Sequence, residues 1–268
     1  MSFVGRGQQS LLGFDPGSVG GLILWLDAAD RNTITMTGSN VSSWFDKSKN
    51  GYTMNTAPSG CALPIVGSNL NGLSTVGINT YSTGIKQSTV IPTFTNAFWV
   101  RKERTGNEGF QFYFGSDGNY DFHPGDNAQF VHSGLVPQGV RDASLSMFRS
   151  TGVTTGTLAT TVMPTGGQIN LVSISNMRGP ARVQGLSYDR GNTSRSATCD
   201  WGEVLLYSNA LSPAQIQAVE GYLAWKWGIS SYLPTTHTHR TSPPAVRPFP
   251  RWTCGGSRSG SMERIVTQ

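Results

Sequence analysis

Paired carboxylates are the first residues to consider for catalysis, because two carboxyl groups facing each other roughly 5 to 10 Å apart can hydrolyse a glycosidic bond. Asp126, Asp142, Asp189 and Glu203 are the acidic residues that such a site would have to use. Nothing in their spacing places two of them on one face of a strand. The sequence also contains no Gly-x-Ser-x-Gly elbow, His-Glu-x-x-His helix, phosphate loop or dinucleotide fingerprint. We therefore predict a protein that is not an enzyme.

Asp117, Asn119 and Asp121 have the spacing that opens a calcium-binding loop. The rest of such a loop is missing, since Phe122 stands at the glycine position and Ala128 at the position of the bidentate carboxylate. We expect a hydrogen-bonded turn at this point, and we predict neither a metal ion nor a cofactor.

Three widely spaced cysteines, Cys61, Cys199 and Cys254, include no Cys-x-x-Cys pair. His237 and His239 could join Cys254 around a metal, but no second cysteine pair completes a zinc site. An odd number of cysteines without a pairing pattern indicates reduced thiols, and one disulfide with one remaining thiol is the alternative.

Sugar recognition requires exposed aromatic side chains beside amide or carboxylate groups, because the aromatic face packs against the sugar ring. Trp44, Tyr52, Tyr81 and Tyr120 lie in loop-like sequence and are the candidates for a carbohydrate-binding surface. For Trp44, which belongs to a motif of the fold, we favour packing within the fold over sugar binding.

The C-terminal tail is basic, with five Arg and one Glu between residues 230 and 268. Its composition cannot form a core alone, but it suits an extended segment that binds a partner through aromatic and charged anchors. A solvated tail is the alternative, and the acidic surface that it would meet belongs to protein, nucleic acid or lipid headgroups. We favour protein over nucleic acid. The candidate contact residues are Arg240, Arg247, Phe249, Arg251, Trp252 and Arg258.

These segments are joined to a chain with one expected helix. Ser212 is a suitable N-cap, Pro213 follows at the first helical position and Gln215 completes a capping box. An apolar stripe then runs to Trp227, and Gly228 stands where a left-handed C-terminal stop is expected. This stripe predicts that the helix covers a sandwich.

The chain before that helix has the composition of many short strands joined by tight turns, with 13% charged residues and 33 Gly. We expect a charged, exposed loop at residues 101–107. The expected strands lie at 22–26, 97–100, 110–114, 129–132, 145–149, 169–174, 182–188 and 203–207. Their spacing favours a two-sheet antiparallel sandwich.

Two pairs of motifs resemble a known family. The first pair is Trp-Leu-Asp-Ala at 25–28 with Trp-Phe-Asp-Lys-Ser-Lys-Asn-Gly at 44–51. The second is Val-Leu-Leu-Tyr-Ser-Asn-Ala-Leu-Ser at 204–212 with Glu-Gly-Tyr-Leu-Ala-Trp-Lys-Trp-Gly-Ile at 220–229. They resemble the laminin-G-like branch of the concanavalin A-like lectin/glucanase superfamily, over roughly residues 21–234. Lys49 replaces a glycine of the family pattern. No Glu matches the Glu-x-Asp-x-x-Glu strand of the family's glucanases.

The resemblance implies an all-β, two-sheet antiparallel jelly-roll sandwich with one C-terminal helix. We predict an N-terminal arm at 1–20, the jelly-roll domain at 21–236 and a basic Pro/Gly/Arg-rich arm at 237–268. Such domains occur in structural proteins of large DNA viruses and in bacterial surface proteins. The resemblance therefore implies a non-enzymatic minor capsid or virion component that binds neighbouring structural proteins. The alternative is a carbohydrate-binding, lectin-like module.

The N-terminus has no charged start and apolar run of a secretion signal, and no apolar segment approaches the length of a bilayer span. We expect a protein that is not inserted in a membrane and is assembled into a virion in the host cytoplasm.

Overall fold

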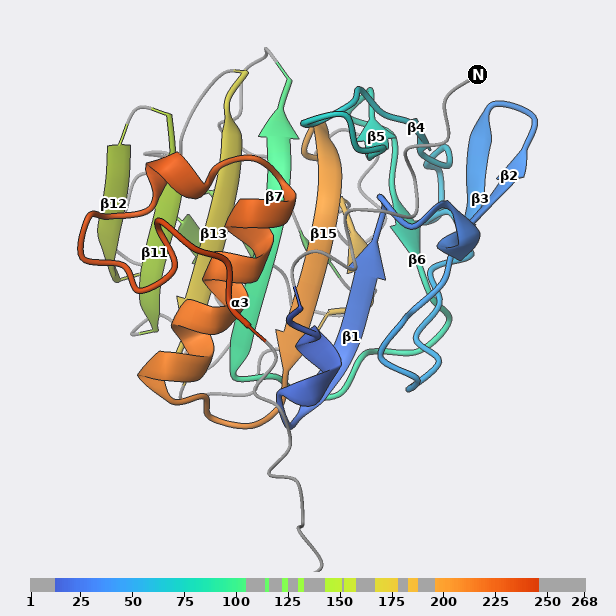
Figure 1. The fold of residues 1–268 in the computed structure, drawn as a ribbon. Helices are drawn as coiled ribbons and strands as arrows, with labels where there is room; N and C mark the ends of the chain where they lie inside the picture. The colour runs from blue at the N-terminus through green and yellow to red at the C-terminus, as the bar shows by residue number, and fades with distance from the viewer. Residues whose placement is uncertain are drawn as a thin grey trace, which may run out of the picture.

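The computed structural model describes residues 13–104, 114–115, 122–124, 130–132, 143–150, 152–157, 167–177, 183–187 and 196–245. Within these residues it contains two antiparallel sheets and one α-helix, α3, near the C-terminus (Figure 1). The predicted all-β sandwich with a C-terminal helix is confirmed. Phe110, Asp117, Asn119, Asp121 and Ala128 lie outside the described residues.

The larger sheet has ten strands in the order β12-β11-β13-β7-β15-β5-β4-β3-β2, with β1 also paired to β15. Strand β15 is central because β7 lies along one edge, while β5 and β1 share the other. The bounds are β1 Leu22–Asp27, β2 Ile34–Thr37, β3 Asn40–Trp44, β4 Ile65–Val66, β5 Val76–Ile78, β7 Asn96–Glu103, β11 Ser144–Arg149, β12 Gly152–Thr157, β13 Ile169–Ser175 and β15 Cys199–Tyr207.

The smaller sheet has five strands in the order β10-β9-β8-β14-β6. These strands are β6 Ile85–Lys86, β8 Phe114–Gly115, β9 Phe122–Pro124, β10 Phe130–His132 and β14 Gly185–Leu186. Three short 3-10 helices, η1 Pro16–Ser18, η2 Arg31–Thr33 and η3 Ser230–Tyr232, complete the described elements. None of the helices in the described part of the chain has the length and apolar character needed to cross a bilayer.

The larger sheet separates two hydrophobic cores, because side chains alternate between its faces. Trp99 of β7 packs on the face toward the smaller sheet, in one core with Phe114. Its neighbours Phe98 and Val100 pack on the opposite face, in a second core with Val219 of α3. The helix lies across this second face, over β13 and β7 (Figure 1).

Helix α3 runs over Pro213–Lys226 and begins as the sequence predicts. The Ser212 hydroxyl accepts a hydrogen bond from the Gln215 backbone, and the Gln215 side chain accepts one from the Ser212 backbone. At the other end Gly228 has φ +72°, the left-handed conformation expected of a C-terminal stop. The predicted capping box and stop are both confirmed.

Replacing the cap tests how far local sequence stabilises this helix. Ser212→Ala leaves the N-terminal amides of α3 without their side-chain acceptor, so we expect unfolding to become easier by about 1 kcal/mol. Chemical denaturation followed by circular dichroism measures the change. Ser231→Ala, at an exposed serine after the helix, is the control, and an equal effect of both variants would contradict the capping role.

The prediction of an exposed loop at 101–107 is wrong for its first three residues. Strand β7 continues to Glu103, and both Arg101 and Glu103 are buried. They are tolerated there because the Arg101 guanidinium lies 2.5 Å from the Glu103 carboxylate, which also accepts a hydrogen bond from Asn170. Residues 105–107 lie outside the described part of the chain.

Candidate functional site

The most concentrated polar chemistry of the described chain lies between the larger sheet and α3. Asp27 at the end of β1 is directly opposite Glu203 of β15 in the strand register. Both side chains are completely buried. Two like charges in such a cross-strand pair repel each other, so the pair needs a cation nearby.

A register irregularity in β15 turns Glu203 toward the helix. Trp201 packs on the face toward the smaller sheet, and the pairing with β7 shifts between Trp201 and Glu203. Gly202 lies at this shift, where a Cβ atom would come within 3.0 Å of the Trp227 ring. Gly202 therefore permits both the turn of the strand and the close approach of α3.

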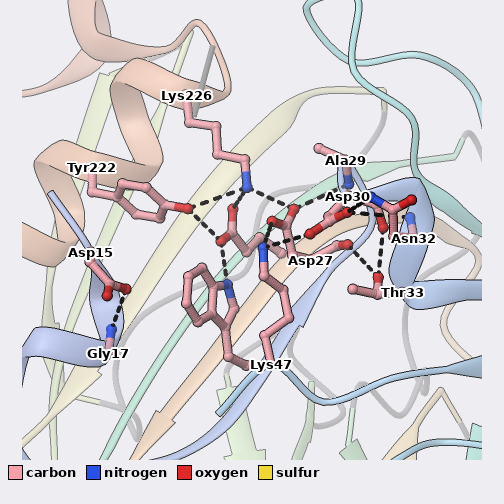
Figure 2. Close-up of polar contacts among 12 residues, drawn as sticks. Asp15, Gly17, Asp27, Ala29, Asp30, Asn32, Thr33, Lys47, Tyr222 and Lys226 are labelled. Carbon is pink, nitrogen blue, oxygen red and sulfur yellow. Dashed lines mark hydrogen bonds and ion pairs between the residues drawn. The ribbon is translucent and has the colours of Figure 1, made fainter. Parts of the chain in front are cut away.

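Lys226, the last residue of α3, supplies the cation. Its Nζ lies 2.7 Å from Asp27 Oδ1 and 2.7 Å from Glu203 Oε2, and its side chain is 3% exposed (Figure 2). Lys47 reaches the other oxygen of Asp27, with Nζ 2.8 Å from Oδ2. We call Asp27, Glu203, Lys226 and Lys47 the buried charge cluster.

Four donors surround the two oxygens of Glu203. Oε1 accepts hydrogen bonds from Trp25 Nε1 at 2.8 Å and from the Tyr222 hydroxyl at 2.9 Å. Oε2 accepts from Lys226 Nζ at 2.7 Å and from Trp227 Nε1 at 2.9 Å. This arrangement fits an acceptor-only carboxylate.

The charges of the cluster shift one another's pKa values. Burial would raise the pKa of Asp27, but attraction to Lys226 and Lys47 holds it below its usual value. Burial and repulsion from Asp27 raise the pKa of Glu203, against the attraction of Lys226. Burial would lower the pKa of Lys226, yet the two carboxylates raise it. The cluster therefore favours an ion pair between Asp27 and Lys226.

Perturbed carboxyl groups often mark active sites, but a catalytic carboxyl group must touch its substrate. Glu103, Glu203 and Glu220 are the Glu residues that the structure describes, and they are 1%, 0% and 4% exposed. Each has a cationic or histidine partner within 3.2 Å. These three residues therefore present no carboxyl pair to solvent. Asp126, Asp142 and Asp189 lie outside the described residues.

The four aromatic residues predicted for sugar binding do not form one surface. Trp44 is completely buried in the core between the sheets, which confirms its packing role and excludes it as a stacking surface for a sugar. Tyr52 is half-buried against the same core. Tyr81 is 40% exposed, and Tyr120 lies outside the described residues. Trp44 is buried because the motif that contains it anchors β3 in the core.

Tyr81 stands on a loop whose backbone is firmly held. The Tyr81 carbonyl accepts a hydrogen bond from the Ser196 amide at 3.0 Å, and the Ser82 carbonyl accepts one from Ala62 at 2.8 Å. The Thr83 hydroxyl donates to the Asn79 side-chain oxygen at 3.3 Å. Asn79 is exposed like Tyr81, so an aromatic ring and an amide face solvent on one ordered loop.

A groove of about 600 Å³ lies between the first half of α3 and the two ends of the described chain. Phe14 and Val19 line it from the N-terminal side, Ala218 from the helix, and Pro244 and Ala245 from the C-terminal side. Asp15 is its acidic lining residue. The groove has the size of a typical ligand site and a largely apolar lining.

The predicted partner-binding residues of the tail mostly lie outside the described residues: Arg247, Phe249, Arg251, Trp252 and Arg258. Arg240 is described, and its guanidinium donates a hydrogen bond to the Leu233 carbonyl of the same chain. Their role in partner binding stays a prediction.

His237 and His239 pack on α3. His237 Nε2 lies 3.2 Å from Glu220 Oε2, and the His239 carbonyl accepts a hydrogen bond from Trp225 Nε1. Cys254 is outside the described residues, within which no group of His, Cys, Asp and Glu side chains has the arrangement of a metal site. The predicted absence of a metal stays a prediction.

The Asp46 side chain fixes the loop that follows β3 through hydrogen bonds to backbone amides. The Asp46 carboxylate accepts hydrogen bonds from the backbone of Trp25 at 2.9 Å, Ser48 at 2.8 Å and Tyr52 at 3.2 Å. Lys49 has φ +74°, a conformation that favours glycine. Lys49 therefore takes the left-handed conformation at the position where the family pattern has a glycine.

No protein-family model and no curated protein matches the chain. Several solved structures are similar to it. One is a mutant of a GH54 α-L-arabinofuranosidase soaked with 4-nitrophenyl α-L-arabinofuranoside, with a TM-score of 0.44 and 13% identity over 77% of this chain. Another is an arabinofuranosidase complexed with arabinofuranosyl-α-1,2-xylobiose, with a TM-score of 0.42 and 13% identity over 78% of this chain. The match spans 60% of each enzyme's length.

A third similar structure is domain 4 of AbnA, a GH43 extracellular arabinanase from Geobacillus stearothermophilus, in complex with arabinotriose. Its TM-score is 0.39 and its identity 12%, over 73% of this chain and 96% of the domain. All three are carbohydrate-active enzymes or parts of them. At these TM-scores and identities the similarity carries no argument about the activity of this chain.

Proposed function

We propose that the chain is a non-catalytic carbohydrate-binding module built on a concanavalin A-like sandwich. The observation that supports it is the ordered loop at 79–83, which carries the exposed residues Tyr81 and Asn79 two positions apart. An aromatic face packs against the apolar face of a sugar ring, and an amide hydrogen-bonds its hydroxyl groups.

The order of this loop matters because ligand binding is weakened by any segment that must first be fixed. Ser196 and Ala62 already hold the loop backbone through the hydrogen bonds described above. The buried carboxylates support the non-catalytic part of the proposal, because Asp27 and Glu203 are fully covered by α3 and the sheet.

Tyr81→Ala tests the proposed site. A glycan array with the wild-type chain identifies a ligand, and titration calorimetry then compares the variants. We expect Tyr81→Ala to weaken binding about tenfold or more, the loss expected when one aromatic contact is removed. Phe45→Ala is the matched control, because Phe45 is 45% exposed on another loop. Equal losses in both variants, or no glycan bound by the wild type, would contradict the proposal.

A second candidate function is assembly into a larger particle, such as a virion, through the chain ends. The groove between α3 and the terminal segments supports it, because its apolar lining suits an extended segment of a neighbouring structural protein. Deletion of residues 246–268, which follow the last residue lining the groove, should abolish incorporation into the parent particle and leave the melting temperature of the sandwich unchanged. Normal incorporation of the deleted chain would exclude this role for the tail.

A further inference from the structure

Lys226 and Asp27 are held in direct contact inside the fold, as a buried ion pair. The Lys226 amine nitrogen lies 2.7 Å from an oxygen of the Asp27 carboxyl group, and both side chains are almost completely buried. An amine and a carboxyl group at this distance have a very high effective concentration, and water does not compete for either of them. Glu203 lies within hydrogen-bond distance of the same nitrogen.

We propose that Lys226 and Asp27 condense to an isopeptide bond, with Glu203 transferring the protons. A bond forms between Lys226 Nζ and Asp27 Cγ, and one Cγ–O bond of Asp27 breaks. The departing oxygen leaves as water with two of the three ammonium protons. The third proton stays on the amide nitrogen. No oxidant, reductant or further reactant is needed.

The other two members of the buried charge cluster, Glu203 and Lys47, assist this step. Glu203 accepts a proton from the Lys226 ammonium, which frees the nitrogen lone pair for attack, and returns it to the departing oxygen. Its raised pKa, caused first by burial, suits a carboxylate that must accept a proton. Lys47 lies 2.8 Å from Asp27 Oδ2, where it stabilises the negative charge that develops on that oxygen during attack.

The ion pair is the starting state of the reaction. The two carboxylates raise the pKa of Lys226, so the neutral amine is the minor form at neutral pH. Slow condensation is sufficient, because the bond has to form once in the lifetime of each folded chain. Trp25, Tyr222 and Trp227 surround Glu203 and exclude the water that would hydrolyse an intermediate.

The bond would join the end of β1 to the end of α3, across 199 residues of sequence. A covalent link across so long a segment restricts the unfolded chain strongly, as a disulfide does. It would also prevent α3 from separating from the larger sheet under mechanical load. This consequence is independent of the ligand that the chain binds.

Intact-mass spectrometry of the full chain tests the proposal. After incubation in the folded state, the wild type should weigh less than its sequence mass by one water molecule. Tandem spectra of a digest should contain a branched peptide that joins the segment of Asp27 to the segment of Lys226. A fully folded wild type with the unreduced sequence mass would overturn the proposal, whether or not any variant folds.

Two variants separate this reaction from dehydration elsewhere. K226R keeps a cation between the carboxylates but offers a guanidinium that is a poor nucleophile, so it should retain the full sequence mass. D27N should condense by losing ammonia, and its product should have the same mass as the condensed wild type. Loss of water from K226R would place the dehydration at another site and overturn the proposal.

Discussion

Lys226→Met is expected to destabilise the chain more than any other single substitution in the buried charge cluster. Methionine fills a similar volume but leaves Asp27 and Glu203 opposite each other without the cation that lies 2.7 Å from both. Removing one partner of a buried ion pair leaves an uncompensated buried charge, which costs roughly 3 to 5 kcal/mol. Chemical denaturation monitored by tryptophan fluorescence measures the loss. The loss of stability is expected whether or not Lys226 forms a covalent bond, because methionine can form neither the ion pair nor the bond.

Lys47→Met is the matched control for this prediction. Lys47 contacts the same Asp27 carboxylate, but its side chain is 17% exposed and Lys226 remains in place. Solvent screens the Lys47 charge, so we expect a clearly smaller loss. If the two variants lost equal stability, the central position assigned to Lys226 would be wrong.

Glu203→Gln is expected to have the second largest effect, although it changes a single atom. The two oxygens of Glu203 accept hydrogen bonds from four donors. A glutamine replaces one oxygen with an amide group whose hydrogens point at donors on Trp25 and Tyr222, or on Lys226 and Trp227. Each buried donor left without an acceptor costs roughly 1 to 3 kcal/mol, so we expect a loss of about 2 to 4 kcal/mol in unfolding free energy.

Thermal and chemical denaturation measure this loss, with Asp30→Asn as the control. Asp30 is also a carboxylate beside Lys47, but its side chain is 21% exposed and lies at the edge of the cluster. We expect Asp30→Asn to lower the free energy of unfolding far less than Glu203→Gln does. An unchanged stability of Glu203→Gln would show that the contacts from Tyr222, Lys226 and Trp227 do not hold α3 on the sheet.

The helix and many of the strands could be predicted because their signals are local. Ser212, Gln215 and Gly228 determine the ends of α3 through contacts within a few residues. Strands such as β11 and β13 follow short β-prone runs between turn residues. Arg101 shows the limit of such signals. A charged residue is predicted to be exposed, and local sequence does not reveal that Arg101 is buried in an ion pair with Glu103.

The buried charge cluster could not be predicted as a unit. Asp27 and Lys226 are separated by 199 residues, and only the pairing of β1 with β15 under α3 brings them together. One signal was present in the sequence. Asp27, Glu203 and Lys226 each stand within or directly beside an apolar run, in a chain with 13% charged residues. Charged residues in such places are usually buried and paired.

The aromatic candidates illustrate the same difference. Trp44 and Tyr81 both lie in sequence rich in polar and turn residues, yet the first is buried in the core and the second is 40% exposed. Local composition cannot distinguish them, because the direction of each side chain depends on the sheet register of its strand. The structure therefore removes Trp44 from the predicted sugar-binding residues and leaves Tyr81 exposed.

The most direct test asks whether the glycan-binding site is separate from the buried carboxylates. Glycan binding is measured for Glu203→Gln and for Tyr81→Ala, at a temperature where circular dichroism shows that both variants are folded. We expect Glu203→Gln to bind the wild-type glycan with an unchanged Kd despite its lower melting temperature. Tyr81→Ala should bind the glycan about tenfold more weakly or worse, with an unchanged melting temperature. Loss of binding or of glycan cleavage in folded Glu203→Gln, with normal binding by Tyr81→Ala, would place the site at the buried carboxylates and contradict the proposed function.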